Sequence, residues 1–340
     1  MSILEVNDIT KLYNGVNGVK NISFTIDEKG VYGFLGPNGA GKSTTMNIMT
    51  GCLAATSGTV KIGDFDIYKD PVYAKMMLGY LPEQPPLYME RTPREYLNFV
   101  AEAKGIVKSE RKAHIEEVMA RTQITDVADR LIKYLSKGYK QRVGIAQAII
   151  GDPELIILDE PTVGLDPNQI LEIRKLIKEL GKDHTVILSS HILQEVNAVC
   201  DKIIIIVKGK LIAIDTPENL AKKFAGDSRI YLTVQASKDE CKKILDDVNN
   251  RNIISNIISN IQIRENDGKC QISMGYVSET DEVLKDLFFA FANSKKAILE
   301  MTNKQASLEE IFYELTNSED GTAIIGQDSN KSDENGEDKS

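Results

Sequence analysis

The stretch Val31–Thr44 (VYGFLGPNGAGKST) joins a short apolar run to a glycine-rich loop. It contains the pattern G-x-x-x-x-G-K-[S/T], which runs from Gly36 to Ser43. Apolar residues at helical spacing follow as far as Met49, so we expect a strand, a loop and a helix in that order. Glycines let successive backbone N–H groups converge on an anion, and the helix adds its positive end. The stretch therefore predicts a phosphate-binding loop.

Two side chains of this loop carry specific chemistry. Lys42 is expected to place a mobile positive charge on the β- and γ-phosphates of a nucleotide, and Ser43 to offer its hydroxyl to Mg²⁺. The residues expected to surround the phosphates are Gly36, Pro37, Asn38, Gly39, Ala40, Gly41, Lys42, Ser43 and Thr44.

The stretch Leu155–Glu160 (LIILDE) supplies a second half of the site. Its continuous apolar run is typical of a parallel strand buried on both faces. Such a strand delivers the two acids that follow it to the carboxyl edge of the sheet, where α/β proteins bind ligands. We expect Asp159 to act on Mg²⁺ through its water shell, and Glu160 to orient and deprotonate an attacking water.

The segments around these motifs predict an α/β fold. From residue 155 to 207, apolar strands alternate with amphipathic helices, which indicates a doubly wound parallel sheet. Residues 2–10 and 22–27 alternate apolar and polar side chains, as half-buried strands do. Residues 85–150 are expected to form a helical insert, whose first helix opens at Thr92 with a capping box.

The chain changes character after Pro217. Residues 226–316 predict a smaller α+β domain, with a hairpin turn at Asp267-Gly268 and a last helix opened by a capping box at Ser307. Residues 317–340 are rich in Ser, Asn, Asp and Glu, so we expect a disordered acidic tail. Whether the α+β domain stabilises a dimer, receives a regulatory signal or only packs as an appendage stays open.

Composition excludes several classes of protein. The 340 residues carry a formal charge of −9, and seven acids and two lysines place −5 of it in the tail. The mildly acidic remainder offers no global attraction for nucleic acid, so we expect no nucleic-acid partner. No apolar stretch approaches the roughly 18 residues of a membrane span. We therefore expect a cytoplasmic protein unless something else tethers it.

Between the two phosphate-site motifs lies Leu135–Arg142 (LSKGYKQR). With the loop and the Asp-Glu strand, it resembles the nucleotide-binding subunit of ABC transporters over residues 2–220. The resemblance implies a P-loop NTPase fold in which an antiparallel β subdomain and the helical insert flank the parallel core sheet. It also implies ATP and Mg²⁺ as ligands and hydrolysis of ATP as the activity.

The resemblance assigns roles around the bound nucleotide. Tyr13 is similar to the aromatic residue that stacks on adenine. Gln84 is similar to the glutamine that senses the γ-phosphate and Mg²⁺ and relays movement to the membrane subunit. His191 resembles the switch histidine that contacts the γ-phosphate. With Glu160, Gln84 and His191 form the expected catalytic set.

Other roles belong to a second copy of the subunit. Ser136 and Gly138 are expected to present a hydroxyl and an open N–H to the ATP of the opposite subunit, and Asp166 lies in a loop expected to cross the interface. These residues are too far from the phosphate loop to meet one ATP in one chain. The resemblance therefore implies head-to-tail pairing around two Mg-ATP, with a second copy or a paralogous ATPase subunit.

The signature departs from the family's L-S-G-G-Q, because Lys137 replaces a glycine and Tyr139 replaces the glutamine. The variant resembles ATPases that work with separate ABC-2 type membrane permeases, which implies export and a peripheral position on the cytoplasmic face of the membrane. Residues 85–88 and the helix from Pro93 are candidates for the permease contact.

Two other functions use similar motifs. One is a soluble ABC-type ATPase factor that acts on ribosomes or DNA, and the other is a module that holds ATP without turnover. Ribosome-acting forms usually carry two such units and repair forms carry long coiled coils, whereas this chain has one unit and no sustained heptads. The presence of Glu160 and His191 argues against the module without turnover.

Overall fold

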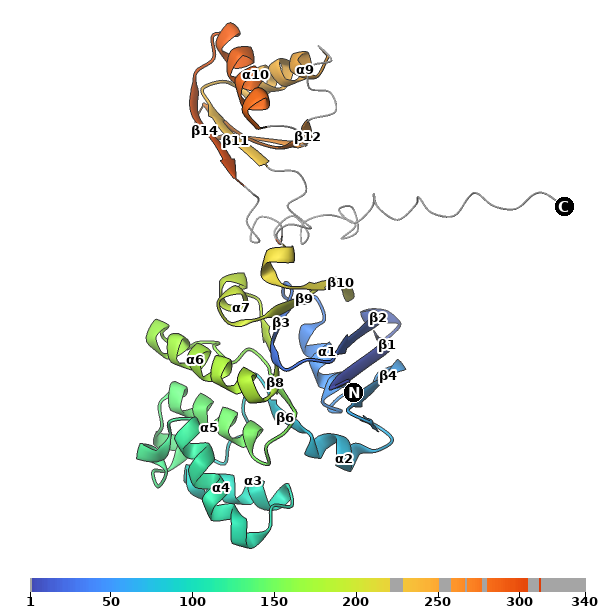
Figure 1. The fold of residues 1–340 in the computed structure, drawn as a ribbon, viewed down its shortest axis with the longest axis vertical. Coiled ribbons are helices and arrows are strands. Elements are labelled where there is room, and N and C mark those ends of the chain that lie inside the picture. The colour runs from blue at the N-terminus through green and yellow to red at the C-terminus, as the bar shows by residue number, and fades with distance from the viewer. Residues whose placement is uncertain are drawn as a thin grey trace, which may run out of the picture. The chain divides into compact units, whose positions relative to one another are not determined.

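The computed structural model of the chain forms two compact units that divide between Pro217 and Glu218. Figure 1 shows the fold of each unit. The structure describes residues 2–220, 229–250, 258–266, 268–276, 280–304 and 312. Within these residues, no helix is both long and apolar enough to span a bilayer.

A six-stranded sheet with the order β10-β9-β3-β8-β7-β6 forms the centre of the first unit. Its neighbours pair in parallel except β10, which runs antiparallel to β9. The expected parallel core sheet is thereby confirmed. The strands are β3 (Gly30–Leu35), β6 (Leu78–Leu81), β7 (Leu155–Leu158), β8 (Thr185–Ser190), β9 (Lys202–Val207) and β10 (Lys210–Asp215).

Burial on both faces explains the continuous apolar runs of this sheet. Every residue of β3, β7 and β8 is buried. Helices α5, α6 and α7 pack against strands of the sheet on one face. On the other face, α1 and the second sheet pack against the parallel sheet and form one core with it. The helices are α1 (Lys42–Met49), α5 (Lys137–Ile149), α6 (Pro167–Asp183) and α7 (Leu193–Val199).

A second, antiparallel sheet has the order β2-β1-β4-β5. Its alternating residues bury one face, where Val6, Ile22 and Val60 join the core shared with α1 and the parallel sheet. The elements are β1 (Leu4–Tyr13), β2 (Val16–Ile26), β4 (Ser57–Ile62), β5 (Phe65–Asp66) and the short helix α2 (Pro71–Met76). This is the antiparallel β subdomain that the family resemblance implies.

Helices fill the stretch between β6 and β7. The predicted capping box is present, because the Thr92 hydroxyl accepts a hydrogen bond from the Glu95 N–H and the Glu95 carboxylate accepts one from the Thr92 N–H. Arg142, which is buried, donates to the Thr122 carbonyl and to the Glu172 carboxylate and so ties α5 to α4 and α6. The further elements are α3 (Pro93–Ala103), α4 (Lys108–Arg121), η1 (Thr125–Val127) and η2 (Ile132–Tyr134).

The second unit is a four-stranded antiparallel sheet with the order β12-β13-β11-β14. Helices α9 and α10 pack on one face of this sheet, where Cys241 and Leu287 share a core with Leu232 and Ile272. The elements are β11 (Arg229–Val234), α9 (Lys238–Asn250), β12 (Ile258–Asn266), β13 (Lys269–Tyr276), α10 (Thr280–Asn293) and β14 (Ile298–Lys304). Asp267 of the predicted turn, the start of the predicted helix at Ser307 and the predicted tail lie outside the described residues.

The contact between β6 and α5 yields a prediction of stability. A Cβ atom at Gly79 would collide with the backbone carbonyl of Ala148, which cannot rotate away as a side chain can. We expect Gly79→Ala to lower the free energy of unfolding by about 1–3 kcal/mol. Urea unfolding of the full chain, followed by circular dichroism, measures this change.

The control for this prediction is Met76→Ala, which shortens an exposed side chain on the neighbouring helix α2. It should change the free energy of unfolding by no more than about 0.5 kcal/mol. Equal stability of the two variants would contradict the close approach of β6 and α5.

Candidate functional site

The loop after β3 is shaped to hold an anion. Gly41, the N-cap of α1, has φ of 103°, a conformation that glycine adopts without strain. A Cβ at Gly36 would collide with the Ile206 carbonyl, so the loop approaches β9 more closely than a side chain allows. The loop therefore carries its backbone N–H groups to the start of α1, where the helix dipole favours negative charge.

Lys42 folds back onto this loop. Its side chain is buried, and its ammonium group donates to the Gly36 carbonyl at 2.8 Å and to the Pro37 carbonyl at 3.3 Å. Burial lowers the pKa of Lys42 below its ordinary value, and the carboxylates of Glu160 and Asp159 oppose this shift. The charge is thus held beside the loop backbone, within the electrostatic field of the two acids.

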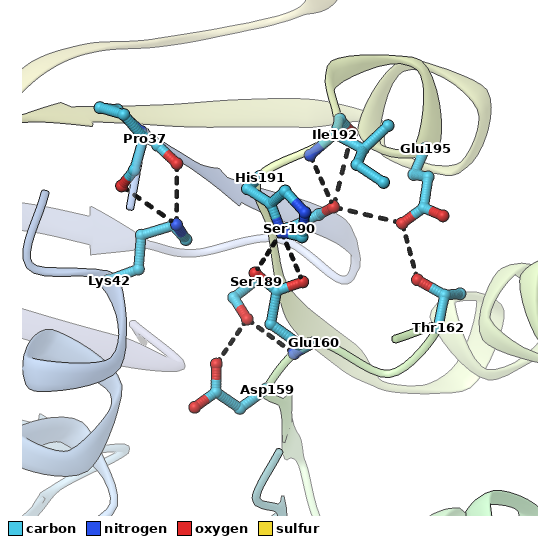
Figure 2. Close-up of polar contacts among 11 residues, drawn as sticks. Pro37, Lys42, Asp159, Glu160, Thr162, Ser189, Ser190, His191, Ile192 and Glu195 are labelled. Carbon is cyan, nitrogen blue, oxygen red and sulfur yellow. Dashed lines mark hydrogen bonds and ion pairs between the residues drawn. The ribbon is translucent and has the colours of Figure 1, made fainter. Parts of the chain in front are cut away.

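The two acids after β7 are fixed by one hydroxyl group. Ser189, near the end of the neighbouring strand β8, donates to Asp159 Oδ1 at 2.6 Å and accepts from the Glu160 N–H at 2.7 Å (Figure 2). Asp159 also donates its N–H to the Leu81 carbonyl at 2.8 Å, which joins it to β6. Glu160 has φ of 49°, which is uncommon for a residue with a side chain. Sequence reasoning did not identify Ser189.

His191 and Glu160, both predicted, are brought into contact. The Nδ1 atom of His191 lies 3.0 Å from Glu160 Oε1 and 3.1 Å from Glu160 Oε2. Glu160 is largely buried, with 12% of its side chain exposed, whereas 42% of the His191 side chain is exposed. A carboxylate that accepts a hydrogen bond from a histidine can serve as a general base whose orientation is fixed.

A buried acid supports the turn that carries His191. Glu195 Oε2 accepts hydrogen bonds from Thr162 at 2.6 Å and from the Ser190 hydroxyl at 3.2 Å, and the Ser190 hydroxyl accepts from the Ile192 N–H at 3.0 Å. These bonds connect the turn after β8 with the segment that follows Glu160. Sequence reasoning did not identify Glu195 either, because its partners come from different elements.

A cavity of about 560 Å³ lies over the loop and Glu160, a size within the usual range of small-molecule sites. Gln84 is absent from its lining, whereas the preceding residue, Glu83, which is exposed like Gln84, belongs to the lining. The lining residues are Tyr13, Gly18, Asn38, Gly39, Gly41, Lys42, Ser43, Thr44, Glu83, Glu160, Val163 and His191.

Tyr13 occupies the end of β1 at the rim of this cavity. The residue is 47% exposed, and Lys11 Nζ lies 5.7 Å from the ring centroid. A Cβ at Gly18 would lie 2.6 Å from the Tyr13 ring, so the glycine allows the ring to lie close against β2. An exposed aromatic face beside a phosphate loop can stack on a planar base.

The signature residues lie elsewhere. Ser136 is the N-cap of α5 and its hydroxyl accepts from the Tyr139 N–H. Asp166 is the N-cap of α6 and accepts from the Gln169 N–H at 3.0 Å, while Gly138 packs against the Gln169 side chain. Ser136, Gly138 and Asp166 are absent from the lining of the cavity, as expected if they serve the nucleotide of another copy.

The oxygen donors of the site fit Mg²⁺ bound together with a nucleotide. No group of three or more His, Cys, Asp or Glu side chains suited to a metal occurs among the described residues. Mg²⁺ usually needs only one or two carboxylates in such sites, because phosphates and water supply the other ligands. Ser43 and Asp159 would hold the ion, and the Ser189 bond occupies only one carboxylate oxygen of Asp159.

The Ser189 hydroxyl generates a kinetic prediction. Hydrogen bonds to charged groups contribute about 1.5–3 kcal/mol, and Ser189 positions both acids. We expect Ser189→Ala to lower kcat for nucleotide hydrolysis roughly ten- to hundredfold. Phosphate release at saturating nucleotide measures the effect. Thr185→Val, at the other end of β8, is the matched control, and equal kcat values for the two variants would contradict the role of Ser189.

Comparisons with known proteins agree with this geometry. A profile of the family described as "ABC transporter" matches residues 19–163. The linearmycin resistance ATP-binding protein LnrL of Bacillus subtilis is 34% identical over 317 residues, which cover 92% of this chain and 98% of that protein. The bacitracin transport ATP-binding protein BcrA of Bacillus licheniformis is 37% identical over 246 residues, 72% of this chain and 78% of that protein.

Solved structures show the same fold. An ATP-binding subunit of an ABC transporter superposes with a TM-score of 0.60 at 30% identity, over 65% of this chain and 93% of that one. The match to LnrL covers 92% of this chain and so includes the phosphate loop, the strand with the two acids and the turn of His191. The chain therefore belongs to the ATP-binding subunits of ABC transporters, which bind and hydrolyse ATP to power transport.

Proposed function

We propose that two copies of this chain close head to tail around two Mg-ATP and thereby drive a separate ABC-2 type export permease. The observation that supports this most directly is the division of the predicted site residues. The cavity contains the phosphate loop, Glu160 and His191, whereas Ser136 and Gly138 lie outside it. A second copy would supply the missing side of each site.

The phosphate loop, the two acids after β7 and His191 have distinct tasks in this proposal. The loop N–H groups and Lys42 bind the phosphates, and Ser43 and Asp159 would hold Mg²⁺, which would neutralise charge on the transferring phosphoryl group. Glu160 orients the attacking water and accepts its proton. His191, hydrogen-bonded to Glu160, holds that carboxylate in position and meets the γ-phosphate.

ATP promotes closure because its affinity for the closed pair differs from its affinity for the open subunits. A ligand that binds the closed pair more strongly than the open subunits shifts the equilibrium towards closure, and its hydrolysis reverses the shift. The names of two relatives, which refer to linearmycin resistance and bacitracin transport, support export as the work that this cycle performs. They do not favour the alternative of a factor acting on ribosomes or DNA.

An exposed aromatic pair is our candidate for the contact with the permease at the cytoplasmic face of the membrane. Tyr88 and Phe99 are 50% and 51% exposed, and their ring centroids are 5.4 Å apart. The ring of Tyr96, which is buried, packs edge-on against the Tyr88 ring, and the two ring centroids are 5.5 Å apart. Exposed aromatic side chains on a rigid base are typical anchors of protein interfaces.

The proposed closure predicts the behaviour of Glu160→Gln. This substitution keeps the shape of the side chain but removes the general base, so hydrolysis should fall about 10²- to 10⁴-fold. Bound Mg-ATP should then persist and the closed pair should accumulate. Sedimentation of the full chain with Mg-ATP should reveal dimers. A protein that stays monomeric with saturating Mg-ATP, even when the permease is supplied, would contradict the proposal.

If the aromatic pair contacts the permease, a substitution in it should abolish binding of the permease without abolishing ATP hydrolysis. Phe99→Asp places a charge where an apolar contact is proposed, so co-purification with the co-expressed permease should be lost while the basal ATPase rate of the isolated chain persists. Val107→Asp is the matched control, because Val107 is also exposed and belongs to the same helical region. Retention of the permease by Phe99→Asp, or its equal loss in the control, would refute this surface.

A further inference from the structure

Two turns that border the nucleotide cavity share one buried acid, Glu195, which has no task in hydrolysis so far. This residue is 8% exposed, and its Oε2 atom accepts from the Thr162 hydroxyl at 2.6 Å and from the Ser190 hydroxyl at 3.2 Å (Figure 2). The residues that follow these two hydroxyl groups, Val163 and His191, both line the cavity. One carboxylate oxygen therefore connects the two turns that carry these lining side chains.

The first turn begins at the general base. The Val163 N–H donates to the Glu160 carbonyl at 3.2 Å, and the Leu165 N–H donates to the Thr162 carbonyl at 3.2 Å. Each bond spans three residues, as in a β-turn, and two such turns in succession leave little slack in the backbone between Glu160 and Leu165. The Thr162 hydroxyl is thus an attachment point for the segment that starts with the base.

The second turn carries His191. The Ser190 hydroxyl accepts from the Ile192 N–H at 3.0 Å while it donates to Glu195, so its bonds close the backbone around His191. At the tip of this turn, the Nδ1 atom of His191 lies 3.0 Å from Glu160 Oε1. The two turns are therefore connected twice, by the contact between His191 and Glu160 inside the cavity and by Glu195 behind it.

The hydroxyl groups are the close partners of the Glu195 charge. The Arg174 guanidinium lies 3.8 Å from Glu195 Oε1, which is beyond hydrogen-bonding distance, and the buried Nε atom of Arg174 has no hydrogen-bond partner among the residues that the structure describes. A buried carboxylate needs hydrogen bonds in place of its water, and bonds to a charged acceptor are stronger than bonds between neutral groups. Glu195 thus holds Thr162 and Ser190 more firmly than a neutral side chain of similar shape.

We propose that Glu195 is a positioning residue for ATP hydrolysis: through Thr162 and Ser190 it makes the turn after Glu160 and the turn of His191 move as one unit, so that the histidine reaches the nucleotide only together with the base. Thr162, Ser190 and Glu195 are absent from the lining of the cavity, so they act without touching the nucleotide. The inference rests on the proposed function, in which His191 meets the γ-phosphate.

The ring of His191 provides a readout besides activity. The chain has three histidines, so a full chain labelled at the histidine ring carbons gives three sets of ring signals in an NMR spectrum. His191→Ala assigns the signal of interest. His114 accepts from the Gly151 N–H, and His184 lies 2.8 Å from the Pro153 carbonyl, and both are absent from the lining of the cavity. Their signals are therefore internal references for the general state of the fold.

The variants break the connection at one turn at a time. Thr162→Val keeps the shape of the side chain but removes its hydroxyl, and Thr162→Ser, which keeps the hydroxyl, is the matched control. Ser190→Ala breaks the connection at the other turn and is a second, independent variant. Spectra are recorded without nucleotide and with Mg²⁺ and a non-hydrolysable ATP analogue, and kcat and KM for ATP are measured on the same proteins.

In wild type and Thr162→Ser we expect one sharp His191 signal that moves when the analogue binds. In Thr162→Val and Ser190→Ala the nucleotide-free signal should broaden or split, because the turn of His191 samples more than one position. Their kcat should fall about tenfold, since a bond to a charged group is lost, while KM stays within about twofold. The His114 and His184 signals should not change.

A wild-type His191 signal and kcat in both Thr162→Val and Ser190→Ala, or an equal loss in Thr162→Ser, would overturn the inference alone. Equal broadening of the His114 and His184 signals in both variants would also overturn it, because the effect would then be a general loss of structure. A wild-type His191 signal that does not respond to the analogue would contradict the proposed function, and this inference with it.

Discussion

The parallel pairing of β8 with both β3 and β7 is the constraint on which the rest of the site depends. It places the phosphate loop after β3, the two acids after β7 and His191 after β8 at one edge of the sheet. The Ser189 hydroxyl then connects two of these strand ends, since it bonds both Asp159 and the Glu160 N–H. The site thus consists of three segments that lie far apart in the sequence. The buried core of the sheet and the hydrogen bonds of the Ser189 side chain hold these segments together.

The same geometry explains why the subunit is built to work as a pair. The cavity of one chain is lined from the loop side only, and Ser136 and Asp166, the N-caps of α5 and α6, lie outside its lining. Closure by a second copy would complete the charge environment around the γ-phosphate at the moment when water must be excluded.

Sequence reasoning succeeded where the signal is local. The loop Gly36–Thr44 and the stretch Leu155–Glu160 each specify a strand end and its chemistry within a few residues, and the parallel sheet follows from their apolar runs. Ser189 and Glu195 could not be found in this way, because their partners lie about 30 residues away and are set by strand register. Gln84 and Glu83 are adjacent in sequence, so only the path of the loop after β6 determines which of them reaches the cavity.

The most direct measurement is cysteine cross-linking between Asn38, on the phosphate loop, and Ser136, on the signature side, both of which are exposed. In a full chain with Cys52→Ser, Glu160→Gln and cysteines at these two positions, mild oxidation should yield covalent dimers only when Mg-ATP is present. Each single-cysteine chain should give none. Failure of the two positions to join between chains in Mg-ATP, or equal joining without nucleotide, would contradict a nucleotide held between two copies.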